Sequence, residues 1–408
     1  MPIRRPVVVG VPRATILTPV RRLDLIVLAN FLALGIMIAA VPRYLHVVLR
    51  VDRFHTGVAT TIYFVGALLV RAFIGGAVDR IGRRPFIIAP PVVVALITFG
   101  YLRVHSVWHV TALRFLAGSF AALFFTAVTL AATDLVPPER RTASLGRQSV
   151  MTYTGFVIGP ILVDRLVLHG WWTVWVVPAC LHLVTTLIAL TLKETRPPES
   201  GLSSSRAGFD RRVVRPAVGI LAANFTFSCV VTFLPEYAER MRVSRPGTLF
   251  AVYAVAVLVV RSVTGRLADR VGPARFMIPS MLVGGVGLVL LAVARQRWQS
   301  YAALAIVGGG IGGTFPAATS AALARVGAAE RGKAMGTALA LGDVGQASAG
   351  PLVGYLSTQW GFRWVYGIPA AVTFAGVYLV ASMPEVRVKR GAEVVLLGGL
   401  AEGKDMPQ

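Results

Sequence analysis

Four ionisable side chains lie well inside long apolar stretches of this chain. Three are arginines, Arg71, Arg114 and Arg261, and the fourth is Asp343. A charge in an apolar environment is costly, so a residue of this kind normally has a partner or a function. A carboxylate beside an arginine can couple movement to protonation, because the added proton removes the attraction between the two. The alternative for Asp343 is a permanent structural salt bridge that never titrates.

Two of these residues lie at a similar depth in their stretches. Arg71 lies eight residues before Asp79, about 12 Å along a helix. Asp343 lies ten residues after Lys333, about 15 Å along another helix. Asp79 and Lys333 each lie near the end of an apolar stretch. If the two helices are neighbours, Arg71 and Asp343 can therefore meet.

The stretches that hold these residues are long enough to cross a membrane. Hydrophobic residues make up 55% of the chain and charged residues 14%, and the mean hydropathy of +0.70 is far from that of a soluble domain. A membrane span needs about 20 apolar residues. The twelve predicted spans are residues 23–45, 57–78, 85–104, 108–133, 145–167, 171–192, 214–236, 247–267, 276–295, 299–324, 334–357 and 363–383.

The net charge of +23 fits a membrane protein better than a nucleic-acid-binding protein. The arginines lie at the ends of apolar stretches and form no patch with interleaved aromatic residues, so we exclude nucleic acid as a partner. Basic residues prefer the cytoplasmic side, and tryptophans prefer the headgroup level. All seven tryptophans fall at the side that has fewer basic residues. Together with the bias toward alanine, valine and arginine, this predicts a multi-pass protein of a bacterial cytoplasmic membrane with both termini in the cytoplasm.

A charged hinge between two apolar stretches occurs twice, about 190 residues apart. Such a repeat predicts two similar halves, an organisation typical of transporters. The first hinge contains Gly75, Asp79, Arg80, Gly82, Arg83 and Arg84, and the second contains Gly265, Asp269, Arg270 and Gly272. The predicted parts are a cytoplasmic segment (1–22), a six-helix bundle (23–192), a cytoplasmic linker (193–213), a second six-helix bundle (214–383) and a cytoplasmic tail (384–408).

The first hinge resembles the signature loop between spans two and three of the major facilitator superfamily, Gly-x-Leu-Ala-Asp-Arg-x-Gly-Arg-Arg. The second copy departs from it at Pro273 and Ala274, and Asp134 at the end of span four also resembles the family. The resemblance covers nearly the whole chain. It implies an all-α membrane protein with twelve transmembrane helices in two pseudo-symmetric six-helix bundles, which moves a small molecule by alternating access. It also places spans two and eleven side by side, so we hypothesise an ion pair between Arg71 and Asp343.

The hinge has a physical role that its residue types suggest. Gly75 and Gly82 allow close approach and a sharp turn. Asp79 can place a negative charge at the start of span eleven. We expect Arg83 or Arg84 to pair with Asp134. The alternative is that these charges only anchor the loop in the headgroups.

Arg261 lacks a matching carboxylate in the first half, because the position equivalent to Asp343 is near Thr152 in span five, which is neutral. Arg114, followed by Gly118, resembles a span-four motif that the family associates with proton transfer. The alternative for Arg114 is an arginine that extends toward the outer interface. The polar candidates for the substrate cavity are Asn30, Asn224, Thr226, Ser228 and Gln346, each of which could instead bond helix to helix.

The direction of transport depends on a motif of glycine and proline. Gly155, Gly159 and Pro160 in span five resemble the antiporter motif of drug:proton exporters, although Val163 and Asp164 stand where that motif continues with glycines. The matching helix-kink residues in span eleven are Gly350, Pro351 and Gly354. We therefore favour proton-coupled efflux over proton-coupled uptake or facilitated diffusion, and over a receptor or scaffold that transports nothing. A cavity with few acids disfavours a strongly cationic substrate.

Several other patterns in the chain have simpler explanations. Gly308-x-Gly310-x-x-Gly313 matches a dinucleotide fingerprint but lies inside an apolar helix, where it serves packing. The six histidines have no metal spacing, and no cluster of catalytic groups points to an enzyme. We expect no cofactor. The expected partners are a small-molecule substrate, protons and the lipid bilayer, with the protein acting as a monomer.

Overall fold

The computed structural model of the chain describes residues 13–137, 140–195, 209–327 and 330–383. Within these ranges, the side chains of residues 13–18, 72–76, 79, 142–143, 263–270 and 331–332 are not described. Twelve α-helices account for nearly all of the described residues, none of which forms a strand. This confirms the predicted all-α fold with twelve helices.

The helices fall into two groups of six. The first group contains α1 (Arg13–Val47), α2 (Arg53–Ile81), α3 (Arg84–Gly100), α4 (Val107–Asp134), α5 (Arg141–Leu166) and α6 (Trp171–Leu190). The second group contains α7 (Val214–Arg240), α8 (Pro246–Val271), α9 (Pro273–Val293), α10 (Arg297–Leu323), α11 (Arg331–Trp360) and α12 (Trp364–Ala381). Most helices extend past the predicted spans; α1 begins ten residues earlier, because helical hydrogen bonding continues beyond the apolar segment.

Ten of the described helices are long and apolar enough to cross a membrane. In α8 the described apolar part is shorter, Pro246–Ser262. The remaining helix, α11, carries Asp343 and Gln346 among many small residues. A helix of this composition is suited to line an interior surface rather than to face lipid.

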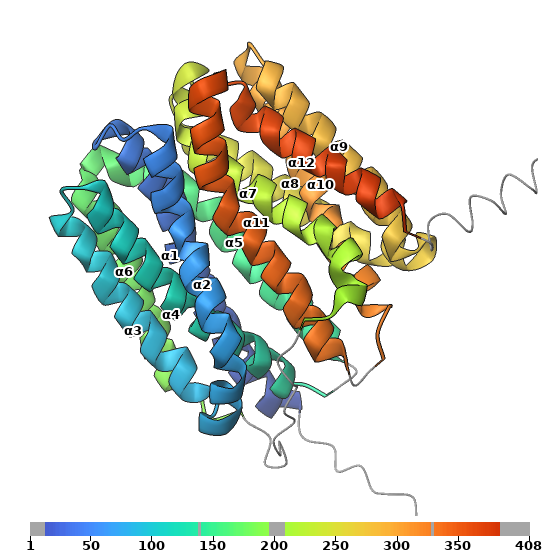
Figure 1. Ribbon diagram of the computed structural model, residues 1–408. Coiled ribbons are helices and arrows are strands. Elements are labelled where there is room, and N and C mark those ends of the chain that lie inside the picture. Colours follow the sequence, from blue (N-terminus) through green and yellow to red (C-terminus); the bar gives the residue numbers. More distant parts are fainter. Residues whose placement is uncertain (1–12, 138–139, 196–208, 328–329, 384–408) are drawn as a thin grey trace, which may run out of the picture.

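The two groups repeat one packing pattern. In the first, α1 packs on α5 and α6, α2 on α4, and α3 on α4 and α6. In the second, α7 packs on α11 and α12, α8 on α10, and α9 on α10 and α12. The groups meet where α2 contacts α11, α5 contacts α8, and α1 contacts α7, and they lie side by side in Figure 1.

Turn glycines repeat in the same way. Gly82 and Gly272 have φ values of 110° and 95°, and Gly170 and Gly361 have values of 102° and 95°. These values lie in a region that favours glycine, which has no Cβ to clash. Each glycine closes one helix just before the next begins, so the duplicated sequence positions make duplicated turns.

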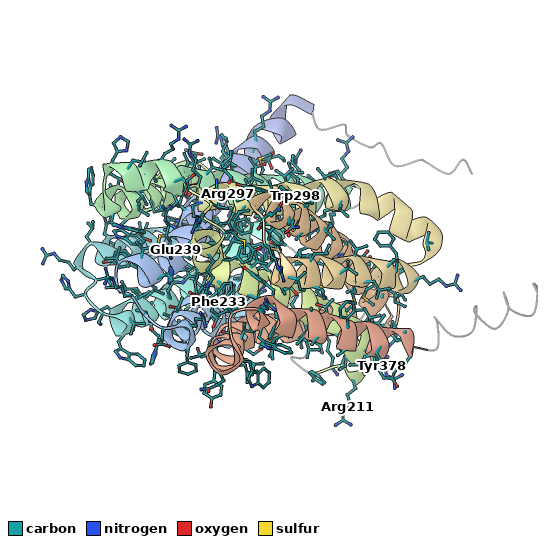
Figure 2. The ribbon with its side chains drawn as sticks, turned by 90° about the horizontal axis from the view of Figure 1, so that it is seen from above. Arg211, Phe233, Glu239, Arg297, Trp298 and Tyr378 are labelled. Carbon is teal, nitrogen blue, oxygen red and sulfur yellow. The ribbon has the colours of Figure 1, made fainter. Side chains whose placement is uncertain are left out.

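We call the face at which α1 begins and α12 ends the terminal face, and the other face the opposite face. All seven tryptophans lie near helix ends at the opposite face, as predicted, including the exposed Trp298, which is labelled in Figure 2. Trp175 lies near the same face but is buried, and its ring stacks on that of Tyr101 with ring centroids 4.8 Å apart. In the same view, Phe233 of α7 lies near the middle of the molecule, where the halves meet.

The described end of the linker is bonded to the second half at the terminal face. The Asp210 carboxylate accepts hydrogen bonds from Arg212, and the Asp210 amide donates to the Thr337 hydroxyl. Arg212 also donates to Glu330 at 2.8 Å. The hydrogen bond from Arg212 lowers the pKa of Asp210 to about 2. These contacts hold the start of α7 against α11 and the segment before it.

Close helix packing depends on glycine at several places. A Cβ at Gly118 would lie 2.6 Å from the carbonyl carbon of Tyr63, and one at Gly155 would lie 2.6 Å from the backbone nitrogen of Leu32. Atoms cannot approach so closely, so α4 could not pack against α2, nor α5 against α1, at their present distances with any larger residue. The Arg114-x-x-x-Gly118 motif therefore includes a packing position.

Replacing Gly118 with valine should destabilise the protein, because the added side chain meets the backbone of α2. Overpacking of this kind costs about 1–3 kcal/mol. The matched control is Gly146→Val, since a Cβ at Gly146 meets nothing within 4 Å and both changes carry the same cost in helix propensity. We expect a clearly lower melting temperature for Gly118→Val than for Gly146→Val in detergent. Equal melting temperatures would contradict the packing role.

Candidate functional site

A central cavity of about 390 Å³ lies between the two halves. Side chains from eight helices line it; the described helices α3, α6, α9 and α12 contribute none. Nine of the lining side chains are aromatic, among them Phe31, Tyr63, Phe125, Tyr153 and Phe156. A volume of this size suits a small molecule.

Two of the five predicted cavity residues line this cavity, Asn224 and Gln346. The prediction was wrong for Thr226 and Ser228, which are buried and do not line the cavity. Successive helical residues point about 100° apart, so Thr226 lies on a different face of α7 from Asn224 and Phe227, whereas Ser228, four residues after Asn224, lies at the edge of their face. Ser228 instead donates a hydrogen bond to the backbone oxygen of Gln346 at 2.9 Å.

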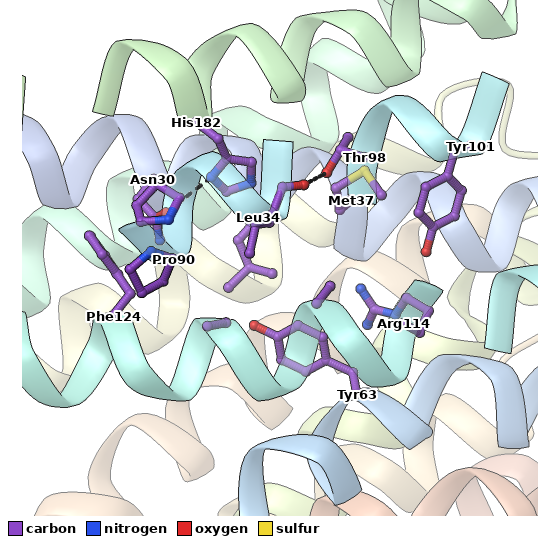
Figure 3. A pocket seen from close by; sticks show the side chains of 14 residues that line it. Asn30, Leu34, Met37, Tyr63, Pro90, Thr98, Tyr101, Arg114, Phe124 and His182 are labelled. Carbon is purple, nitrogen blue, oxygen red and sulfur yellow. Dashed lines mark hydrogen bonds between the residues drawn. The ribbon is translucent and has the colours of Figure 1, made fainter. Parts of the chain in front are cut away.

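Asn30 lines a smaller side pocket inside the first half, not the central cavity. The pocket has a volume of about 30 Å³, and Figure 3 shows it from close by. Asn30 Oδ1 lies 3.1 Å from Nδ1 of His182, and both side chains are buried. This bond joins α1 to α6, which is the helix-to-helix alternative for Asn30.

Arg71 and Asp343 meet across the two halves, as their depth and the family resemblance predicted. Arg71 Nε lies 2.8 Å from Asp343 Oδ2, and the aspartate side chain is 8% exposed. Neither atom has a partner with hydrogen-bond geometry, so the contact is an ion pair without an aligned hydrogen bond. Coulombic attraction between α2 and α11 is therefore the main contribution of this pair.

The equivalent seam between α5 and α8 has a neutral partner. Arg261 Nη1 donates to the Tyr153 hydroxyl at 2.7 Å. The Arg261 guanidinium also lies 5.0 Å from the ring centres of Tyr153 and Phe315. A phenol and two ring faces thus contact this arginine where a carboxylate contacts Arg71, which makes the two seams chemically different.

Arg114 borders both the central cavity and the side pocket. Its side chain lies between Tyr63 and Tyr101 in Figure 3. Nη2 donates to the backbone oxygen of Thr60 at 3.2 Å, and the guanidinium lies 4.6 Å from the Tyr63 ring centre. The residue is 2% exposed, so the alternative of an arginine that extends to the outer interface is wrong.

Ion pairs and glycine contacts close the cavity at the opposite face. Arg53 of α2 bonds to both oxygens of Glu236 of α7, at 2.8 to 3.0 Å, and to the backbone oxygen of Ser357. A Cβ at Gly350 of α11 would lie 2.8 Å from the carbonyl carbon of Gly57 of α2. We call these contacts the opposite-face seal.

The seal includes a second ion pair on the other seam. Asp164 of α5 pairs with Arg43 of α1 at 2.8 Å and accepts a hydrogen bond from the Gly247 amide of α8 at 2.9 Å. On the terminal side, the cavity reaches Thr129 and Leu145, within six residues of the terminal face. The contacts of the described residues thus close the protein at the opposite face and leave a cavity that extends toward the terminal face.

Sequence reasoning missed these ion pairs. Arg43 and Glu236 occupy matching positions of the repeat, each directly after a proline at the end of α1 or α7. Opposite charges at repeated positions could have indicated that both carry partners. Near a helix end, however, charge is as easily explained by the headgroup region, and the sequence alone does not separate the two explanations.

The first hinge forms the predicted ion pair with Asp134. Arg83 Nε lies 3.1 Å from Asp134 Oδ2, and Arg83 is 5% exposed, so it does not merely anchor the loop in headgroups. Arg84 instead donates to the backbone oxygen of Leu190. Glu194, which we did not predict, accepts hydrogen bonds from the backbone amides of Arg83 and Arg84 at the start of α3. A carboxylate is favourable at a helix amino terminus.

Other hinge predictions concern side chains outside the described part of the structure. They are those for Gly75, Asp79, Gly265, Asp269 and Arg270. Arg80 is exposed at the end of α2, and Gly272 begins α9. The contact between Asp79 and α11 stays a prediction.

The glycine motifs of α5 and α11 pack against different partners. Gly155 and Gly159 contact the backbone of α1 within the first half. Gly350 and Gly354 contact the backbone of α2 across the two halves. Pro160 and Pro351 lie inside their helices. The repeated motif therefore stabilises one half in its first copy and the opposite-face seal in its second.

Comparison with known proteins identifies the architecture. Residues 23–248 and 216–399 match the family model described as Major Facilitator Superfamily. The multidrug resistance protein MdtG of Proteus mirabilis is 26% identical over 337 residues, which are 78% of this chain and 83% of the relative. The crystal structure of the nucleoside transporter NupG has a TM-score of 0.76 at 14% identity and covers 90% of this chain and 100% of its own. A bacterial homologue of the human lysosomal transporter Spinster, in an inward-facing and unoccupied conformation, has a TM-score of 0.71 at 15% identity, with 91% and 96% covered.

Replacing Glu236 with glutamine should weaken the opposite-face seal, because Arg53 is then left without a charged partner. A cysteine at Ile38, which lines the cavity, reports opening when Cys180 and Cys229 are removed. We expect a membrane-impermeant maleimide added at the opposite face to label this cysteine severalfold faster. The control is Glu239→Gln, whose carboxylate is 71% exposed beside His46 and should contribute little. Equal labelling rates in the two variants would contradict the sealing role of Glu236.

Proposed function

Because the chain belongs to the major facilitator superfamily, we propose that it exports a small molecule in exchange for protons. The proposal places it in a bacterial cytoplasmic membrane with the terminal face toward the cytoplasm. The distribution of basic residues and tryptophans supports this orientation. The name of the Proteus mirabilis relative, a multidrug resistance protein, supports efflux.

The observation that carries the proposal is the Arg71–Asp343 pair. Its aspartate side chain is 8% exposed and its arginine side chain 28%, the pair joins the two halves, and a carboxylate such as Asp343 can accept a proton. Protonation leaves Arg71 facing a neutral carboxylic acid, so the attraction between α2 and α11 is lost. The proton therefore changes the relative stability of two arrangements of the halves, which is what coupling requires.

Alternating access then follows from the seal and the cavity. With the opposite face closed, a substrate enters the central cavity from the cytoplasm. Release needs the opposite-face seal to open and the terminal side to close, a movement of one six-helix bundle against the other. The charges of the first hinge lie where the terminal side would close.

Arg114 serves this cycle by its charge and not by giving up a proton. A guanidinium stays protonated in proteins. It can attract an anion or stabilise a nearby negative group. Proton acceptance therefore falls to Asp343, the carboxylate at the seam.

Uptake and facilitated diffusion use the same cavity but differ in coupling. Efflux by proton exchange expels the substrate against its gradient and stops when the proton gradient collapses. Uptake raises the cellular content, and facilitated diffusion is indifferent to the gradient. Dye content in cells that produce the protein separates the three.

Replacing Asp343 with asparagine should uncouple transport, because the amide cannot accept the proton. Cells that produce the chain should accumulate severalfold less fluorescein than control cells, and a protonophore should abolish the difference. We expect Asp343→Asn to reduce the rate of dye export at least about tenfold, which is the size of effect expected for a group that acts in proton transfer.

The matched control is Asp24→Asn. Asp24 pairs with Arg147 within the first half, so its loss breaks an ion pair without touching the seam. Unchanged, protonophore-sensitive export by Asp343→Asn would remove this carboxylate from the mechanism. Export that a protonophore does not affect would refute proton coupling.

A further inference from the structure

The described side chains that line the central cavity carry positive charge. Among its described lining residues, Arg114 and Arg261 are the charged side chains, and none is an aspartate or glutamate. The other polar groups there are neutral amides and hydroxyls, such as Gln148, Asn224 and Gln346. A cavity lined by one sign of charge raises the local concentration of the opposite ion.

Arg114 is the less satisfied of the two arginines. A guanidinium has five N–H donors, yet among the described residues it makes one hydrogen bond, to the Thr60 backbone oxygen. Its Nε is buried without a partner. Its remaining close neighbour is the face of the Tyr63 ring. All of these contacts are with neutral groups.

Three other arginines between the described helices meet a carboxylate. Arg53 pairs with Glu236, Arg71 with Asp343 and Arg83 with Asp134. Burying a cation without a counter-charge is unfavourable. The position of Arg114 at the wall of a cavity that a small molecule can enter means that the counter-charge can come from that molecule.

We propose that the transported molecule is a small organic anion, with its carboxylate or sulfonate bound by Arg114 and an apolar, aromatic body in the central cavity. This rests on the proposed function, because it names the substrate class of the same cavity. The fork of a guanidinium matches a carboxylate through two parallel hydrogen bonds. The free Nε of Arg114 supplies one donor for such a contact.

The aromatic wall of the cavity fits the rest of the molecule. Phe31 packs edge-on against Phe125 and Phe156, with ring centroids 6.0 and 5.6 Å apart, and all three line the cavity. An aromatic body gains from burial against such rings. Arg261, held over the rings of Tyr153 and Phe315, adds a second positive charge on the other half. A cationic substrate would be repelled from both sides.

Three ligands with one ring system test the charge preference. They are 2-naphthoate, its neutral amide 2-naphthamide, and the cation (2-naphthylmethyl)ammonium, each radiolabelled and bound to the purified full chain in detergent. We expect 2-naphthoate to bind at least about tenfold more tightly than the amide, in line with a hydrogen bond between charged groups. The cation should bind more weakly than the amide.

Arg114→Gln should lower the affinity for 2-naphthoate by at least about tenfold and change that for the amide by less than about twofold. Arg114→Lys keeps the charge but not the forked donor geometry, so its affinity for 2-naphthoate should lie between those of the unmodified chain and Arg114→Gln. The control is Arg103→Gln, because Arg103 is exposed outside the cavity. Monodisperse elution confirms folding, and the ranking of the ligands on the unmodified chain tests the proposal even where a variant does not fold.

The proposal is overturned if the amide or the cation binds as tightly as 2-naphthoate, or if Arg114→Gln leaves the affinity for 2-naphthoate unchanged. Flux in vesicles with and without a pH gradient tests the exporter separately. Tight binding of 2-naphthoate without gradient-driven flux refutes the exporter and keeps the anion site. Gradient-driven flux of the amide or the cation, without a preference for the anion, supports the exporter and refutes the anion site.

Discussion

A charge held away from water must be compensated inside the protein, and this constraint organises the functional part of the molecule. Four interior positions meet it in different ways. Asp343 compensates Arg71 across the halves, Asp134 compensates Arg83 beneath the first hinge, and Tyr153 with two rings surrounds Arg261. Arg114 meets only a backbone oxygen and a ring. Of these four arginines, Arg71 and Arg83 each have a carboxylate partner, whereas Arg114 has the weakest compensation and borders the cavity.

The duplicated scaffold makes these differences visible. Packing pairs, turn glycines and the positions of the seams repeat between the halves. The chemistry on that scaffold does not repeat. The α2–α11 seam has an ion pair and the α5–α8 seam has a tyrosine, and the glycine motif that packs α5 on α1 packs α11 on α2. Duplication thus explains the frame, and divergence at single positions places the Arg71–Asp343 ion pair at the α2–α11 seam and the Arg261–Tyr153 hydrogen bond at the α5–α8 seam.

The sequence predicted the frame and part of the site. Length and hydropathy indicate membrane spans because hydrocarbon thickness sets a minimum length. Depth counted from the helix ends, together with the neighbouring spans that the family resemblance implies, predicted the pair of Arg71 and Asp343. The residues that line the cavity were harder to predict. Which side of a helix faces the cavity depends on the rotation of the helix about its axis, and hydropathy does not report this rotation for α7, which is apolar on most sides. Thr226 and Ser228 were misplaced for this reason. Glu194 and Glu236 were missed because a carboxylate near a helix end has an ordinary explanation in the headgroup region.

In the proposed mechanism, a single ion pair contributes to the switching of the halves, so its strength can be compared with the free energy that switching needs. Moving a two-state equilibrium from 1:99 to 99:1 takes about 5.5 kcal/mol. Removing one charge from a buried pair costs about 3–5 kcal/mol, whereas an exposed pair contributes about 0–1 kcal/mol. In the proposed mechanism, protonation of Asp343 could therefore supply most of this free energy, whereas protonation of an exposed carboxylate such as Glu239 could supply little of it. The same mechanism requires the state closed at the opposite face and the state closed at the terminal face to differ in free energy by only a few kcal/mol. A larger difference could not be reversed by one proton.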